Sequence, residues 1–190
     1  MDGHNWGMAA SLTGRLLIAS PSIHDPNFRR TVIYMTEHGE SGAMGLVLNR
    51  VAQTTVDEAV PDLAWLAGGD AVVHVGGPVA AQSVVVLAEF ENPSLAALVV
   101  DGDVGFVPAE IEDRDALSAA LRRTRVFAGH AGWGPGQLDE EMEREDWIIE
   151  TPRPDELFAT DPEGLWSQVL TRKGGTFALV ARMPLDPSLN

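Results

Sequence analysis

The sequence predicts an α+β fold, in which a mixed, largely antiparallel sheet is surrounded by helices. Short loops join the strand-like segments of the first half, and helical patterns are inserted between strands without a regular strand–helix–strand alternation. The 190-residue chain is 45% hydrophobic and 22% charged, as in an ordinary globular domain. A chain of this size can bury a core without disulfide bonds or a structural metal.

Three strands, two of them paired in a hairpin, are predicted in the first quarter of the chain. Residues 14–19 are a compact apolar run, and the prolines and aspartate in 21–26 then impose turns. Residues 31–37 are rich in β-branched and aromatic side chains, which favour a strand. A five-residue, glycine-containing loop connects them to the apolar run 43–48, so these two segments form a hairpin.

The middle of the chain is predicted to hold one capped helix and several strands. Thr55 opens a Thr-x-x-Glu capping box, so a short helix begins there and ends or kinks at Pro61. The apolar segments 72–75 and 83–90 predict two strands around a Gly-Gly-Pro turn. Residues 104–107 predict a further short strand.

Helical periodicity appears in the second half. Residues 113–123 place four apolar side chains on one helical face, with basic residues at the end that the helix dipole favours. Residues 125–129 predict a strand. An acidic helix is expected over 136–145, followed by a strand over 146–150.

The last predicted helix follows Asp161-Pro162, an N-cap residue and a proline suited to the first helical position. Gly174-Gly175 ends it. Residues 176–182 predict a final strand.

The charge balance opposes direct binding to nucleic acid. Thirteen basic and 28 acidic residues give a net charge of −15, whereas DNA binding depends on Lys and Arg replacing counterions on phosphates. The basic groups 29–30, 122–125 and 172–173 are short and separate, and we interpret them as solvated faces and helix ends. No signal peptide and no membrane-spanning run is predicted, so we expect a cytoplasmic location without membrane contact.

No catalytic residue, metal site or cofactor is predicted, which leaves enzymatic activity uncertain and less favoured. The chain has no cysteine, and no two of its five histidines are four residues apart. Ser41 lies in a Gly-x-Ser-x-Ala sequence between two strands, whereas a nucleophile elbow lies between a strand and a helix. The glycine-rich segment 129–136 precedes a helix whose first turns carry three carboxylates, which would repel a phosphate.

Several motifs, taken in order, resemble the YqgE/AlgH family. The similarity runs from about Gly14 to about Pro184, and each piece alone is weak. The motifs occupy residues 16–21, 25–34, 37–38, 42–50, 76–79, 132–133, 136–141 and 147. The chain departs from the family pattern at Ala88, where a histidine is common nearby, and at His130, where other members can carry tyrosine.

The resemblance implies a bifurcated sheet with a small barrel-like part, bacterial origin and a cytosolic location. It implies no settled activity, although the family carries a transcriptional-regulator label through a link to alginate regulation. Since the sequence has no recognition-helix signature, such regulation would be indirect. We expect a flexible N-terminus over 1–13, one family domain over 14–186 and a tail over 187–190.

Two functional hypotheses follow. The first is a non-enzymatic regulatory or interaction protein that acts through another protein. The alternative is a small-molecule-binding protein or an undescribed enzyme with a pocket formed by matched polar and glycine positions. The candidate binding residues are Arg30, His38, Asn49, Gly76, Gly77, Gly132 and Trp133.

Overall fold

The computed structural model describes residues 11–68 and 71–184. The outermost part of the expected flexible N-terminus and the tail 187–190 lie outside these ranges. Leu12, which is described, donates its backbone N–H to His38 Nδ1 at 3.1 Å. None of the described helices is long and apolar enough to cross a membrane.

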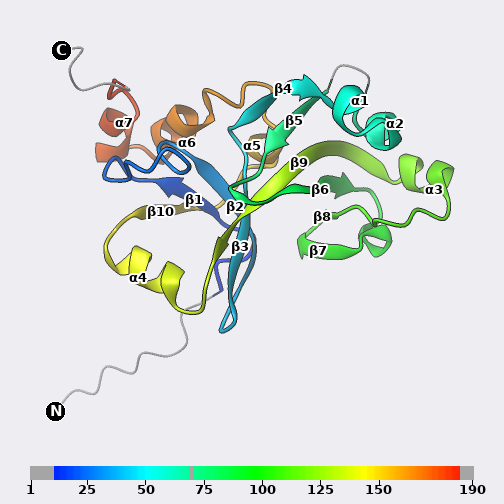
Figure 1. Ribbon diagram of the computed structural model, residues 1–190. Coiled ribbons are helices and arrows are strands. Elements are labelled where there is room, and N and C mark those ends of the chain that lie inside the picture. Colours follow the sequence, from blue (N-terminus) through cyan, green and yellow to red (C-terminus); the bar gives the residue numbers. More distant parts are fainter. Residues whose placement is uncertain (1–10, 69–70, 185–190) are drawn as a thin grey trace.

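In these ranges ten strands form one branched sheet, and the helices lie around it (Figure 1). The strands are β1 (Leu16–Ala19), β2 (Val32–Gly39), β3 (Gly42–Val47), β4 (Val51–Thr55), β5 (Val72–Val75), β6 (Val79–Phe90), β7 (Leu98–Asp101), β8 (Val104–Phe106), β9 (Leu121–Trp133) and β10 (Trp147–Glu150). The α-helices are α1 (Val56–Ala59), α2 (Ala64–Ala67), α3 (Arg114–Ala119), α4 (Gln137–Glu143), α5 (Pro154–Leu157), α6 (Leu165–Lys173) and α7 (Thr176–Val180). Short 3₁₀ turns cover Pro61–Leu63 and Pro93–Leu95.

The sheet runs in the order β10-β1-β2-β3-β9-β6-β8-β7, and all of these neighbours are antiparallel. A second branch leaves β9, because β5 pairs with it in parallel and carries β4. The predicted α+β class and the branched, largely antiparallel sheet are therefore confirmed, and the sheet is not closed.

The branch point depends on a backbone approach that glycine permits. Gly76 N–H donates to the Ala128 carbonyl on β9, and the Gly76 carbonyl accepts from Val47 N–H at the end of β3. A Cβ atom on Gly76 would lie 2.2 Å from the Gly129 carbonyl oxygen. Gly76 therefore joins the two branches at the strand that they share.

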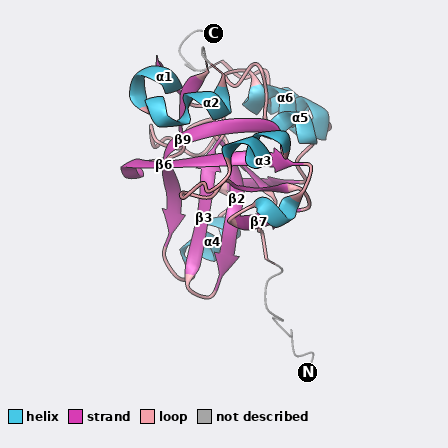
Figure 2. Ribbon diagram, turned by 90° about the vertical axis from the view of Figure 1, so that its right-hand side faces the viewer, coloured by secondary structure: helices cyan, strands magenta, loops and turns pink. Residues whose placement is uncertain are grey.

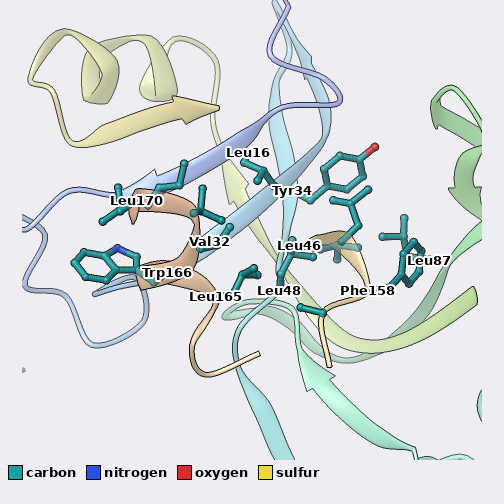
Figure 3. Close-up of a cluster of buried hydrophobic side chains, with 14 of the residues drawn as sticks. Leu16, Val32, Tyr34, Leu46, Leu48, Leu87, Phe158, Leu165, Trp166 and Leu170 are labelled. Atoms are coloured by element: carbon teal, nitrogen blue, oxygen red, sulfur yellow. The ribbon is translucent and has the colours of Figure 1, made fainter. Parts of the chain in front are cut away.

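The first three strands are buried on both faces, which explains their nearly continuous apolar sequences. Side chains alternate across a strand, so on β2 Val32 and Tyr34 face one cluster, while Ile33 and Met35 face the other. The first cluster includes the buried face of α6, and Figure 3 shows Trp166 and Leu170 of this helix among its side chains. The second cluster packs under α4.

The capping box at Thr55 and the helix ends at Val60 and Gly174 are confirmed. The predicted hairpin is also present, but its strands extend to Gly39 and Gly42, so its turn is shorter than expected. Asp161 caps a turn by accepting from Gly164 N–H at 3.1 Å, whereas α6 itself begins only at Leu165, so that N-cap assignment was wrong.

Two other element assignments were wrong. The segment 176–182, predicted as a strand, forms helix α7, because positive φ angles at Gly174 and Gly175 turn the chain back and place Phe177 against the core beside α6. The helix predicted over 113–123 ends at Ala119, because β9 begins two residues later, where Leu121 pairs with Phe90 of β6.

The long strand β9 extends well beyond the predicted 125–129 segment (Figure 2). Its residues from Leu121 to His130 pair with β6 and its last three residues pair with β3, so it spans both parts of the sheet. The sequence analysis missed strands β4 and β7 and helices α2 and α5.

We predict that Gly76→Ala lowers the free energy of unfolding by about 3 kcal/mol, because its Cβ and the Gly129 carbonyl cannot both keep their positions. Gly39→Ala is the matched control, since a Cβ there meets nothing within 4 Å, and we expect it to change stability by less than about 0.5 kcal/mol. Urea denaturation of both variants measures the difference. Equal stabilities would show that the branch point tolerates a side chain.

Candidate functional site

The segment that enters β2 is held in an unusual backbone conformation. Arg30 has a φ of 54°, which non-glycine residues rarely adopt. The buried Asn49 side chain brackets it: its Oδ1 accepts from Val32 N–H at 2.8 Å, and its Nδ2 donates to the Arg30 carbonyl at 2.8 Å. Both ends of the Asn49 amide are therefore used to fix the backbone beside Arg30, a positioning role.

Three arginines line a cavity of about 390 Å³ at this end of β2. We call it the arginine cleft and define it by Arg29, Arg30 and Arg50, with Asn49, Glu163 and Trp166 completing its main walls. The cleft lies where the turn before β2, the start of β4 and the start of α6 meet.

Two of the cleft arginines, Arg30 and Arg50, donate to backbone carbonyls. The Arg30 guanidinium lies 4.6 Å from the centre of the Trp166 ring and donates to the carbonyls of Met183 and Pro184. Arg50 donates to the Arg29 carbonyl at 2.7 Å. Burial, and secondarily the charge of Arg29, lower the pKa of Arg30 from its ordinary value.

No carboxylate in the described ranges forms an ion pair with these three arginines. Glu163 lines the same cavity without pairing to any of them. The cleft is thus a local concentration of positive charge on a chain of net charge −15.

Two of the seven predicted binding residues, Arg30 and Asn49, lie together in the arginine cleft. Gly77 lines a smaller adjoining hollow of about 240 Å³ that also contains Arg50. Gly76 lies at the branch point, where its backbone hydrogen bonds are already used. Gly76 and Gly77 are therefore functional candidates mainly because they set the course of the backbone.

The structure places His38 away from the arginine cleft. It lies at the opposite end of β2, six residues beyond Val32, a separation of about 20 Å along an extended strand. Its Nδ1 accepts from Leu12 N–H at 3.1 Å, and its Nε2 lies 3.9 Å from Asp139 Oδ1. The cavity lined by Arg30 and Asn49 therefore does not include His38 among its lining residues.

Trp133 and Gly132 lie at the same end as His38, where β9 pairs with Ala43 and Met44 of β3. The indole N–H groups of Trp133 and Trp147 both donate to Glu141 Oε2 at 2.8 Å. Phe28 lies against both rings, with centroid separations of 6.4 and 6.0 Å. This arrangement anchors α4 to the sheet, and it gives Trp133 a structural role.

A second cavity, of about 510 Å³, lies between β5, β9 and the loop that precedes α6. We call it the His74 chamber, because His74 lines it while being only 4% exposed. Neither ring nitrogen of His74 has a hydrogen-bond partner among the described residues. Burial and the charge of Arg125 lower the pKa of His74 to about 4. The nearby backbone of Val72 favours the protonated ring and so opposes this shift, although it does not reach hydrogen-bond geometry.

Arg125 also lines this chamber. Its guanidinium donates to the carbonyls of Leu157 at 3.3 Å and Ala159 at 2.6 Å. Burial, and secondarily the charge of Arg123, lower its pKa to about 10. The sequence analysis missed both residues, and the only available signal was a histidine inside the strand-like segment Val72–Val75.

Within the described ranges, no group of three His, Asp or Glu side chains is placed to hold a metal ion.

The comparisons with known proteins agree with the fold. A family profile described as AlgH-like matches residues 16–178. The chain belongs to the AlgH-like family. A UPF0301 protein of Streptomyces coelicolor is 42% identical over 187 residues, covering 95% of this chain and 96% of the relative. A UPF0301 protein of Mycobacteroides abscessus is 37% identical over 93% of this chain and 87% of the relative.

Two solved structures share this architecture. The crystal structure of protein DIP2367 from Corynebacterium diphtheriae has a TM-score of 0.79 at 28% identity and covers 90% of this chain and 91% of its own. The solution structure of AlgH from Pseudomonas aeruginosa has a TM-score of 0.69 at 28% identity, with 98% and 100% covered. The family assignment made from the sequence motifs is confirmed.

We predict that Glu141→Ala destabilises this AlgH-like protein by about 2–4 kcal/mol, because two part-buried indole N–H groups lose their acceptor. Glu140→Ala, one position earlier on α4 and exposed, should cost less than about 0.5 kcal/mol. Thermal unfolding monitored by tryptophan fluorescence compares them. Equal losses would assign the effect to the helix and not to the indole bonds.

The pH dependence of stability gives a second prediction. His74 is harder to protonate in the folded protein than in the unfolded chain, where its pKa returns to the ordinary value of 6.5. Stability is therefore lost as the pH falls from about 6.5 towards 4, by about 2 kcal/mol between pH 7 and pH 5. His74→Leu should remove most of this loss while leaving the carboxylate contributions in place. Urea denaturation at pH 7 and pH 5 measures the loss of stability. An equal loss in the wild type and in His74→Leu would contradict the prediction.

Proposed function

We propose that this AlgH-like protein is a non-enzymatic regulatory protein of the cytoplasm that binds a small anionic ligand in the arginine cleft and acts through another protein. The observation that carries the proposal is the group Arg29, Arg30 and Arg50, which meet in one cavity without a carboxylate partner in the described structure. Arginine presents a planar fork of donors that matches carboxylate and phosphate oxygens.

The surroundings of these arginines make the cleft more favourable for an anion than the rest of the protein surface is. The chain as a whole repels anions, so a site for them needs a local excess of positive charge in a concave position, where field lines are focused. The volume of about 390 Å³ is in the range of small-molecule sites. Because Arg29 makes no side-chain hydrogen bond in the described structure, its donors remain available to a ligand.

The basic groups outside the cleft support action without direct contact to nucleic acid. Arg122 pairs with Glu91 at 2.7 Å and with Asp103 at 2.8 Å. Arg172 and Lys173 are likewise paired with neighbouring carboxylates, each through a contact of 2.7 or 2.8 Å. Their charges are already neutralised, so they form no continuous basic surface for a phosphate backbone.

The side chains of the cleft favour binding over catalysis. The hydroxyl of Ser167 donates to the Ala181 carbonyl at 3.1 Å, and each end of the Asn49 amide makes a hydrogen bond with the backbone. Arginine side chains remain protonated near neutral pH and do not act as bases there. The described cleft therefore holds no nucleophile with an adjacent base.

The edge strand β7 supports action through a protein partner. It is the last strand of its branch, and Leu98 and Val99 are 52% and 44% exposed. A free strand edge presents unpaired backbone groups to which an extended segment of another chain can add. This edge is separate from the cleft, so a ligand and a partner could be bound together.

Anion binding by the cleft is tested with inorganic pyrophosphate and citrate as probes, using isothermal titration calorimetry at low ionic strength. We expect the double variant Arg29→Gln/Arg50→Gln to weaken binding of the preferred probe at least about tenfold, because two charge-assisted contacts are lost. Arg144→Gln is the control, since Arg144 at the end of α4 is exposed, pairs with Asp146 and does not line the cleft. Binding that is absent, or that is equal in the double variant and the wild type, would refute the proposal.

A further inference from the structure

The His74 chamber combines an apolar wall with two polar side chains whose interactions are incomplete. In the parallel pairing of β5 with β9, His74 is opposite Phe127. Two residues earlier on each strand are Val72 and Arg125, so side-chain alternation places Val72, His74, Arg125 and Phe127 on one face of the sheet. Val72, His74 and Arg125 of this face line the chamber together with the loop from Ala159 to Glu163.

The first incomplete group is His74. A neutral imidazole carries one N–H donor and one acceptor nitrogen, and both are unpaired in a side chain that is 96% buried, since 4% is exposed. Its aromatic neighbour Phe127, with ring centroids 5.5 Å apart, offers neither a donor nor an acceptor. Buried polar groups in native proteins are nearly always hydrogen-bonded, so an orphaned pair requires an explanation.

The second incomplete group is Arg125. Its two hydrogen bonds go to backbone carbonyls, which orient the guanidinium but leave its charge uncompensated. Asp161 and Glu163 also line the chamber, yet neither forms an ion pair with it. Asp161 instead accepts from Gly164 N–H at 3.1 Å and from Gln168 Nε2 at 3.2 Å. A half-buried cation without a counter-charge is a receptor for an anion.

We propose that the His74 chamber binds a small organic acid with an apolar chain and a hydroxyl group beside its carboxylate. The carboxylate pairs with Arg125, the hydroxyl supplies the donor and acceptor that His74 lacks, and the chain lies against the apolar wall of Val51, Val72 and Ala67. A small shift of the imidazole ring accompanies binding, because both nitrogens are covered in the described structure.

The volume and chemistry of the chamber suit this class of ligand. About 510 Å³ accommodates a molecule of modest size, and a largely apolar lining with a few polar groups is typical of such sites. Asp161 and Glu163 repel additional negative charge beside the single cation Arg125, which favours a ligand with one carboxylate. His74 is neutral above about pH 5 because its pKa is lowered to about 4, so it does not add a second positive charge.

This site is distinct from the arginine cleft, although the two share Val51 and Glu163 in their walls. The inference does not depend on the proposed function of the cleft. The two can fail separately, because Arg29 lines the cleft and not the chamber, while Arg125 lines the chamber and not the cleft.

The test uses the full chain at about pH 7 and three probes: 2-hydroxyhexanoate, hexanoate and the uncharged 1,2-hexanediol. Binding is followed by NMR chemical shifts of backbone amides and by calorimetry. We expect 2-hydroxyhexanoate to bind most tightly, hexanoate several-fold more weakly, and the diol at least about tenfold more weakly, since each lacks one of the two polar contacts. Shifts should centre on residues 72–75 and 124–126.

Two variants connect the binding to the chamber. Arg125→Gln should weaken the binding of 2-hydroxyhexanoate at least about tenfold, because the positive charge is lost. Because Arg125 also holds two carbonyls, Val72→Phe provides a second route: Val72 is 39% exposed, and the larger ring fills the chamber while leaving the Arg125 hydrogen bonds intact. Arg29→Gln should change binding less than about twofold.

The proposal is overturned if the wild-type protein binds none of the acids, if the diol binds as tightly as 2-hydroxyhexanoate, or if Val72→Phe binds like the wild type. Equal affinities for hexanoate and 2-hydroxyhexanoate would overturn the role given to His74. A tenfold loss of affinity for 2-hydroxyhexanoate in Arg29→Gln would show that the acid binds in the arginine cleft, which contradicts the assignment to the chamber.

Discussion

The backbone contact between the Gly76-Gly77 turn and β9 is the constraint on which the rest of the structure depends. Gly76 links Val47 at the end of β3 to Ala128 on β9 through its own carbonyl and N–H. A Cβ on either glycine of the turn would come within 2.2 Å of the β9 backbone. Only a glycine pair lets the chain pass this close to β9, and the sheet can divide there into a β3 branch and a β5 branch.

The division of the sheet into two branches determines where both cavities lie. The β3 branch carries Asn49 and the cleft arginines at its end, and the β5 branch carries His74. Helix α6 and the loop before it pack across the space between the branches, with Trp166 donating its indole N–H to the Ala19 carbonyl at 2.9 Å. Val51, the first residue of β4, leaves the first branch for the second and therefore lines both cavities. The same geometry that branches the sheet thus brings two unpaired cationic regions close together.

Local rules predicted the parts of the fold that depend on local interactions. The Thr55 capping box and the β2–β3 hairpin need only a few neighbouring residues, and both are present. The fate of residues 176–182 was decided instead by non-local packing of Phe177 onto the core. The start of β9 was obscured because Arg122 and Arg123, typical of a helix end, form cross-strand ion pairs with acidic residues of β6 and its neighbours. Arg30 and Asn49 could be named as candidates because they belong to a recognisable motif, whereas His74 and Arg125 meet only through the parallel pairing of strands about fifty residues apart.

A chain with 28 carboxylates could easily have paired all of its arginines, and several are paired at the sheet and on α6. In each cavity one arginine binds backbone carbonyls instead: Arg30 those of Met183 and Pro184, and Arg125 those of Leu157 and Ala159. A carbonyl fixes the direction of a guanidinium without cancelling its charge, so the group is pre-organised and remains electrically unsatisfied. Carboxylate partners would stabilise the empty protein but would compete with an anionic ligand. The distribution of ion pairs therefore separates the arginines that hold the fold together from those that remain available for binding.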